Sequence, residues 1–228
     1  MTPSPADDRE DISFEDFVEF SRKADELATF ELINGRLIVK YGPRDVENFE
    51  ELAELAPKGV KLEFINGKLK VKPLPDQLHK AMVMWLLRVC MQQRPELAFY
   101  PEQELRVETY RKGRAIADGA LAPVDHFVAS PRPELWGDPK GVLMVVEVTS
   151  RDRDTHRRDR IEKRDGYAAS EIPVHLLIDR DADSLVVFSE PRNGFYQERA
   201  AYPFGATVPL PGPVDITLET EKLKEYAR

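Results

Sequence analysis

One short segment constrains the fold of this chain more than any other. Val142 to Val146 are all apolar, and Glu147 follows them directly. A run of branched apolar residues without polar alternation is typical of a strand that is buried on both faces of a sheet. A buried carboxylate is unstable unless a cation or a hydrogen-bond donor compensates it. Glu147 therefore marks a solvated strand end, pairs with an arginine further along the chain, or binds a metal ion.

The length, charge and cysteine content narrow the class of protein. The 228 residues suffice for one catalytic domain with a small appended subdomain. No long uncharged apolar stretch is present and the N-terminus is acidic, so we expect a cytoplasmic protein with no membrane segment. Cys90 is the only cysteine, which excludes a disulfide and a cysteine-based zinc site within one chain. The net charge of -8 argues against a general nucleic-acid coat protein, although a local basic face can still hold phosphates.

Two segments near the N-terminus, residues 13–40 and 48–72, resemble one another. Each begins with apolar residues at helical spacing and continues into a strand-like stretch with an Ile-Asn-Gly sequence, at residues 33–35 and 65–67. The Asn-Gly pair suits the positive φ angles of a type I′ turn, so each segment predicts a helix followed by a hairpin. We expect residues 1–47 to be an N-terminal extension and the second copy to open the main fold.

The rest of the chain predicts a helix, three strands, a second helix and two further strands. Asp76 can cap the first helix, which carries an apolar face. The expected strands are 98–109, 114–121, 142–149, 172–179 and 184–190, and the second helix runs from about 152 to 169. This order favours an α/β fold with its core at residues 48–200, followed by a C-terminal strand or tail at 201–228.

A second carboxylate, Asp118, also lies in a strand-like apolar context. A hairpin-like connection could bring it beside Glu147. On the predicted helix, Asp159, Lys163 and Tyr167 recur every four residues and share one face, which can reach the end of the strand. Two carboxylates on adjacent strands and a lysine are the groups needed to hold Mg²⁺ and to stabilise the charge that develops at a phosphate under attack.

Together these motifs resemble the Uma-type restriction endonucleases, a family of the PD-(D/E)XK nuclease superfamily. The resemblance spans about residues 49–190. It implies a restriction-endonuclease-like fold, a mixed sheet of four or five strands flanked by helices. The motifs that carry it are LEFINGKL (62–69), the helix opening with His79, IADGALAP (116–123), VVEVTSRDRDTHRRDRIEKRDGY (145–167) and IPVHLLID (172–179).

The resemblance also implies roles for individual residues. Asp118 and Glu147 match the two acidic metal ligands, and the Val148 carbonyl is the expected third ligand. Ala117 stands in place of the usual proline, which is a backbone preference. These assignments imply Mg²⁺ as the cofactor, with Mn²⁺ as a substitute.

Thr149 occupies the position of the superfamily lysine. In members that resemble this family the lysine moves to the following helix, where Lys163 matches. The alternative is that Lys163 is an exposed helical lysine paired with Asp159. Under the first interpretation Lys163 orients the attacking water or stabilises the transition state, and its removal lowers cleavage about a hundredfold while leaving metal binding nearly intact.

Two further residues are supporting candidates. Glu63 precedes the second Asn-Gly turn and can support the metal site from a neighbouring strand. Its counterpart in the first copy, Glu31, makes a structural role in the turn at least equally compatible. His79, in the first turn of an apolar helix, fits either a supporting role in the site or a cap at the edge of the core. The arginine-rich segment 151–164 fits either a phosphate-binding face or a solvated helix with ion pairs.

The resulting hypothesis is a Mg²⁺-dependent endonuclease that hydrolyses DNA by means of a metal-activated water, with RNA left open as a substrate. Asp118, Glu147 and Lys163 are the expected catalytic residues. The alternative is a nuclease-fold module that has lost efficient chemistry and binds nucleic acid or protein; Thr149, Ala117 and the acidic charge favour it. The sequence leaves open whether the chain forms a homodimer.

Overall fold

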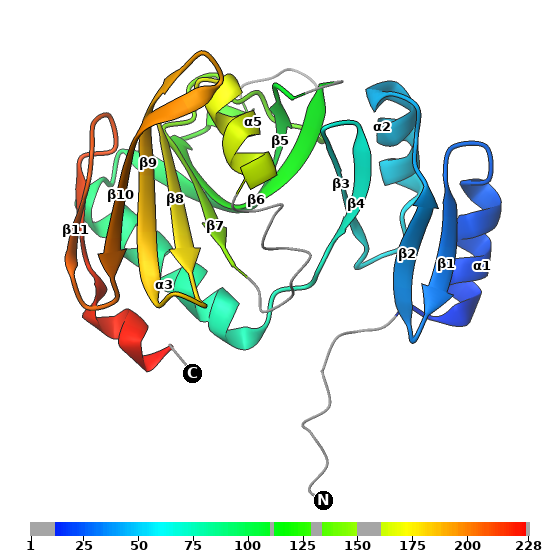
Figure 1. The fold of residues 1–228 in the computed structure, drawn as a ribbon, viewed down its shortest axis with the longest axis horizontal. Coiled ribbons are helices and arrows are strands. Elements are labelled where there is room, and N and C mark those ends of the chain that lie inside the picture. Colours follow the sequence, from blue (N-terminus) through cyan, green and yellow to red (C-terminus); the bar gives the residue numbers. More distant parts are fainter. Residues whose placement is uncertain (1–11, 110–111, 129–133, 150–160, 227–228) are drawn as a thin grey trace, which may run out of the picture.

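A mixed β-sheet of eight strands lies at the centre of the fold, with helices on both faces (Figure 1). The computed structural model describes residues 12–109, 112–128, 134–149 and 161–226. The predicted α/β class, a mixed sheet flanked by helices, is confirmed. The expected number of strands was too low, because a hairpin extends the sheet at each of its two ends.

The N-terminal part contains two helix and hairpin units. Ser13 and Asp45 cap the two helices by accepting hydrogen bonds from the backbone amides of Asp16 and Asn48. Both turns have positive φ angles at Asn and Gly, as a type I′ turn requires. The units are α1 (Phe14–Lys23), β1 (Thr29–Ile33) and β2 (Arg36–Tyr41), then α2 (Val46–Leu55), β3 (Lys61–Ile65) and β4 (Lys68–Lys72).

Up to residue 192, the remaining helices and strands follow the predicted order. The elements after β4 are α3 (Gln77–Gln93), β5 (Leu97–Val107), β6 (Gly113–Pro123), the 3-10 helix η1 (His126–Val128), β7 (Met144–Val148), α5 (Lys163–Ala169), β8 (Val174–Asp179), β9 (Ser184–Arg192), β10 (Phe195–Pro203), β11 (Thr207–Leu210), β12 (Ile216–Glu219) and the 3-10 helix η3 (Thr220–Glu225). Of the helix expected at about 152–169, residues 152–160 lie outside the described residues.

The strand order of the central sheet is β10-β9-β8-β7-β6-β3-β4, and β5 pairs with β6. β7 and β8 are parallel, and the other paired strands are antiparallel. β1 and β2 form a separate two-stranded sheet, whereas β3 joins the central sheet by pairing with β6. The second helix and hairpin unit is therefore part of the main sheet, and the first unit stands outside it.

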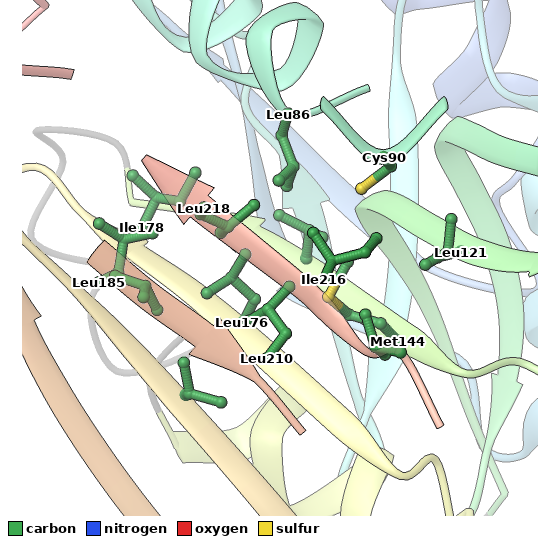
Figure 2. Close-up of a cluster of buried hydrophobic side chains, with 14 of the residues drawn as sticks. Leu86, Cys90, Leu121, Met144, Leu176, Ile178, Leu185, Leu210, Ile216 and Leu218 are labelled. Atoms are coloured by element: carbon green, nitrogen blue, oxygen red, sulfur yellow. The ribbon is translucent and has the colours of Figure 1, made fainter. Parts of the chain in front are cut away.

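The two faces of the sheet are covered by different helices. Met144, Val146 and Val148 of β7 point toward α3, and the core on that face also takes in the C-terminal hairpin β11–β12. Figure 2 shows Leu86 and Cys90 of α3 facing leucine and isoleucine side chains of β8 and of this hairpin. On the other face, Val145 packs in the same cluster as Tyr167 of α5. Residues beyond 200 thus contribute to the main core as well as to the edge of the sheet.

None of the helices in the described ranges has a stretch long and apolar enough to cross a membrane.

His175, on β8, is a fully buried polar residue in an aromatic cluster. Its ring stacks on Phe188, with 5.4 Å between ring centroids, and meets Tyr167 edge-on at 5.5 Å. Within the described part of the chain neither ring nitrogen has a hydrogen-bond partner. Burial lowers the pKa of His175 from 6.5 to about 3, and the charges of Arg164 and Lys163 act in the same direction. The imidazole is therefore neutral in the folded protein.

This burial predicts a stability that depends on pH. Below pH 6.5 the unfolded chain takes up a proton at His175 that the folded chain binds only near pH 3, so stability is lost as the pH falls through this window. The loss from this group approaches about 1.4 kcal/mol per pH unit. Urea unfolding of wild type and His175→Phe between pH 7 and 4 should therefore give a steeper loss in wild type. Parallel curves for the two proteins would rule out His175 as the source.

Candidate active site

The site lies along one edge of β6, where two strands leave a gap. β3 pairs with β6 at Arg114, and β7 pairs with it from Gly119 onward. Between these points side chains take the place of a neighbouring strand. The backbone amide of Ile116 donates to Glu63 Oε1 at 2.8 Å, and its carbonyl accepts from Lys72 and Lys163, each at 2.8 Å. The gap in strand pairing therefore brings charged side chains into the interior.

Asp118 is buried in this gap and accepts hydrogen bonds from three sides. Lys72 Nζ lies 2.7 Å from Oδ1, while the Val148 amide lies 2.8 Å and His79 Nε2 3.2 Å from Oδ2. Burial favours the neutral acid, but Lys72 and the contact with His79 hold the pKa of Asp118 well below its usual value. Asp118 is therefore an ionised carboxylate in the interior, as a metal ligand has to be.

Glu147 is fully buried at the end of β7, on the face that α5 covers. Lys163 Nζ lies 3.1 and 3.2 Å from its two carboxylate oxygens, and the Tyr167 hydroxyl donates to Oε1 at 2.5 Å. The spacing of four residues between Lys163 and Tyr167 places both side chains on the same face of the helix. The predicted approach of this helical face to the strand end is observed, and Asp159 lies outside the described residues.

Lys163 is 1% exposed, so its interpretation as an exposed helical lysine is wrong. Besides Glu147, its ammonium contacts Glu63 Oε1 at 2.7 Å. An ammonium group is stable in the interior only when such partners replace its hydration. Lys163 thus joins the carboxylates of β3 and β7, and Glu63 takes part in the cluster rather than in its own turn.

The hydrogen bonds of Thr149 join two neighbouring strands. It is fully buried, its amide donates to the Ile178 carbonyl at 3.0 Å, and its hydroxyl accepts from the Arg180 amide at 2.9 Å. Thr149 thus holds β7 to the end of β8, and the ammonium group that contacts Glu147 is that of Lys163 on α5. A role of the Val148 carbonyl as a metal ligand stays a prediction.

Lys72 is the site residue that the sequence did not reveal. A signal was present, because Glu31 and Lys40 in the first copy have the same spacing as Glu63 and Lys72 in the second. In the first copy, Lys40 Nζ and Glu31 Oε1 pair with each other at 3.2 Å on the surface. In the second copy, β6 and α5 provide other partners, and both side chains become buried. The repeat by itself therefore does not distinguish the buried lysine from the exposed one.

Arg164 is the arginine of the segment 151–164 that lies within the described residues. Arg164 pairs with Asp165, with Nε 2.8 Å from Oδ1, and its guanidinium lies over the ring of Phe188 at 5.7 Å from the centroid. For Arg164, these contacts favour a solvated helix with ion pairs over a phosphate-binding face. Residues 151–160 of the segment lie outside the described residues.

The carboxylate oxygens of this site are the type of ligand that Mg²⁺ prefers. No group of three or more histidine, cysteine or acidic side chains is arranged as a ready metal site in the ranges described. Mg²⁺, however, prefers oxygen ligands, keeps several of its waters, and is commonly held by one or two carboxylates. Asp118 and Glu147 lie on neighbouring strands where β6 and β7 diverge, because Gly119 pairs with Val146 and the Val148 amide contacts Asp118. These two carboxylates are the residues that would hold the ion.

Comparisons with known proteins agree with this architecture. The family model Uma2, described as "Putative restriction endonuclease", matches residues 46–221. The chain therefore belongs to the Uma2 family, and the resemblance predicted from the motifs is confirmed. No curated protein matches the chain.

A similar solved structure is described as "a putative nuclease belonging to DUF820" from Anabaena variabilis ATCC 29413. It shares 17% sequence identity, the match covers 82% of this chain and 100% of that chain, and the TM-score is 0.58. At this identity the likeness shows a common fold.

Proposed function

We propose that this protein is a Mg²⁺-dependent endonuclease that hydrolyses phosphodiester bonds of DNA. The observation that carries the proposal is the pair of buried carboxylates, Asp118 and Glu147, at the divergence of two strands with the Lys163 ammonium against one of them. Membership in the Uma2 family supports the same reaction class. Buried charges in such a cluster are expensive for stability, and they are typical of sites that perform chemistry.

Each side chain has a distinct task in this proposal. Asp118 and Glu147 would hold Mg²⁺, which when bound supplies Lewis acidity toward the phosphate and the attacking water. Lys163 places a fixed positive charge beside Glu147, where it stabilises negative charge that develops on the phosphate. Tyr167 fixes the orientation of Glu147 by its hydrogen bond, and Lys72 and His79 do the same for Asp118.

The charge-neutral replacement of the first carboxylate tests this function. Wild type is expected to nick plasmid DNA and to cut single-stranded DNA in the presence of Mg²⁺, and to stop when EDTA is added. Asp118→Asn should lose Mn²⁺ binding in calorimetry and lower cleavage by at least about a hundredfold. Cleavage that persists in EDTA, or Asp118→Asn as active as wild type, would contradict the proposal.

A second function is favoured by one observation. Both proposed ligands already have ammonium partners, Asp118 with Lys72 and Glu147 with Lys163, so the protein itself compensates each of these two carboxylates. A module that binds nucleic acid without cutting it would need nothing more. This alternative predicts binding of labelled DNA by wild type that is independent of Mg²⁺, with no cleavage at any concentration of divalent ion.

A further inference from the structure

Lys72 is a second buried ammonium group in the site, and the mechanism above uses it only to orient Asp118. The side chain is 7% exposed and donates to Asp118 Oδ1 at 2.7 Å and to the Ile116 carbonyl at 2.8 Å. The inference that follows rests on the proposed function.

The hydrogen bonds of Asp118 leave little room for incoming cations. A carboxylate oxygen has two acceptor positions. Oδ2 accepts from both the Val148 amide and His79 Nε2, while Oδ1 accepts from Lys72. A divalent ion that binds Asp118 is therefore directed to Oδ1, next to the Lys72 ammonium. A second ion would find no further position on this carboxylate.

The charges of the cluster lead to the same conclusion. Counted as carboxylates and ammonium groups, the buried side chains of Glu63, Asp118 and Glu147 bring three negative charges, and those of Lys72 and Lys163 bring two positive charges. Leaving the imidazole of His79 aside, the cluster has one excess negative charge. One divalent ion reverses it to one excess positive charge, which matches the single negative charge of a phosphodiester. A second ion would build up a larger uncompensated charge in the interior, which is strongly disfavoured.

The hairpin itself does not force Lys72 into this place. Lys40 occupies the equivalent position in the first copy, where it is 47% exposed and pairs with Glu31. The second hairpin differs in that β3 pairs with β6, which brings the end of β4 against Asp118. The contact of Lys72 with Asp118 therefore arises from the tertiary arrangement of the site, and Lys40 is a matched lysine outside it.

We propose that Lys72 is a positioning residue whose fixed charge stands in for a second metal ion. It holds Asp118 in one orientation and restricts the site to a single divalent ion bound with modest affinity. The ion that enters must share Oδ1 with the ammonium, so the repulsion between the two cations weakens binding. The Lys72 ammonium also places positive charge directly beside Asp118.

Calorimetry with Mn²⁺ on the intact protein tests this proposal without requiring activity. Wild type is expected to bind one ion per chain. Lys72→Met removes the charge at similar size and should bind Mn²⁺ at least tenfold more tightly, and Lys72→Gln provides the same test with a polar side chain if the first variant folds poorly. Lys72→Arg should retain the affinity of wild type, and Lys40→Met, the matched control, should leave it unchanged.

The rate of DNA cleavage distinguishes a positioning role of Lys72 from a purely structural one. At saturating Mg²⁺, Lys72→Met should cut DNA at least fivefold more slowly although it binds the ion more tightly, and Lys72→Arg should restore most of the rate. Equal Mn²⁺ affinity in wild type, Lys72→Met and Lys72→Gln, or two ions in wild type, would overturn the role of Lys72 and leave the nuclease proposal standing. Absence of Mn²⁺ binding in wild type and in both neutral variants would instead remove the metal site itself.

Discussion

Glu147→Gln is expected to lower Mg²⁺-dependent cleavage by on the order of a thousandfold. The amide keeps the size of the side chain and an oxygen that can accept from Tyr167, which lies 2.5 Å from Oε1 in the wild type. It loses the negative charge that would hold the ion and that balances the Lys163 ammonium. The measurement is single-turnover cleavage of supercoiled plasmid, together with Mn²⁺ calorimetry, which should show no binding.

A matched control separates this loss from a general effect of removing an acidic side chain. Glu198, on β10, is exposed and lies outside the site, so Glu198→Gln should cleave at the rate of wild type. Circular dichroism of Glu147→Gln shows whether the variant is folded. A folded Glu147→Gln that retains more than about a tenth of the wild-type rate would exclude this carboxylate as a metal ligand.

Lys163→Ala is expected to destabilise the protein by about 3–5 kcal/mol, because removing one partner of a buried ion pair leaves uncompensated charge in the interior. The ammonium contacts both Glu63 and Glu147, which are buried completely. The sequence alone predicted an effect on cleavage with metal binding nearly intact. The burial of Lys163 adds a large cost in stability to that effect.

Urea unfolding in the absence of divalent ions measures this cost. Lys80 is an exposed lysine on α3, and Lys80→Ala should change the free energy of unfolding by less than about 0.5 kcal/mol. Because a divalent ion can replace the missing positive charge, added Mn²⁺ should recover more stability in Lys163→Ala than in wild type. An unfolding curve of Lys163→Ala that coincides with that of wild type would mean that Lys163 is not part of the buried cluster.

Local patterns in the sequence predicted much of the fold. The apolar run before Glu147, the two Asn-Gly turns and the helical spacing of apolar residues each depend on neighbouring residues, and they correctly indicated β7, both hairpins and α3. The same is true of Lys163 and Tyr167, because residues four positions apart share a helical face. The family motifs added the fold class and the proximity of Asp118 to the end of β7.

The tertiary structure decided what depends on pairing between distant strands. β3 and β7 share one edge of β6, and the gap between them makes the backbone of Ile116 a partner for side chains from three other elements. This arrangement selects Lys72 for Asp118 and leaves its counterpart Lys40 on the surface. The sequence by itself therefore determined most of the elements and which acidic residues lie in the strands of the site. Which lysine neutralises which carboxylate was decided only by the packing of the sheet, because both hairpins carry a glutamate and a lysine at the same spacing and differ in what lies beside them.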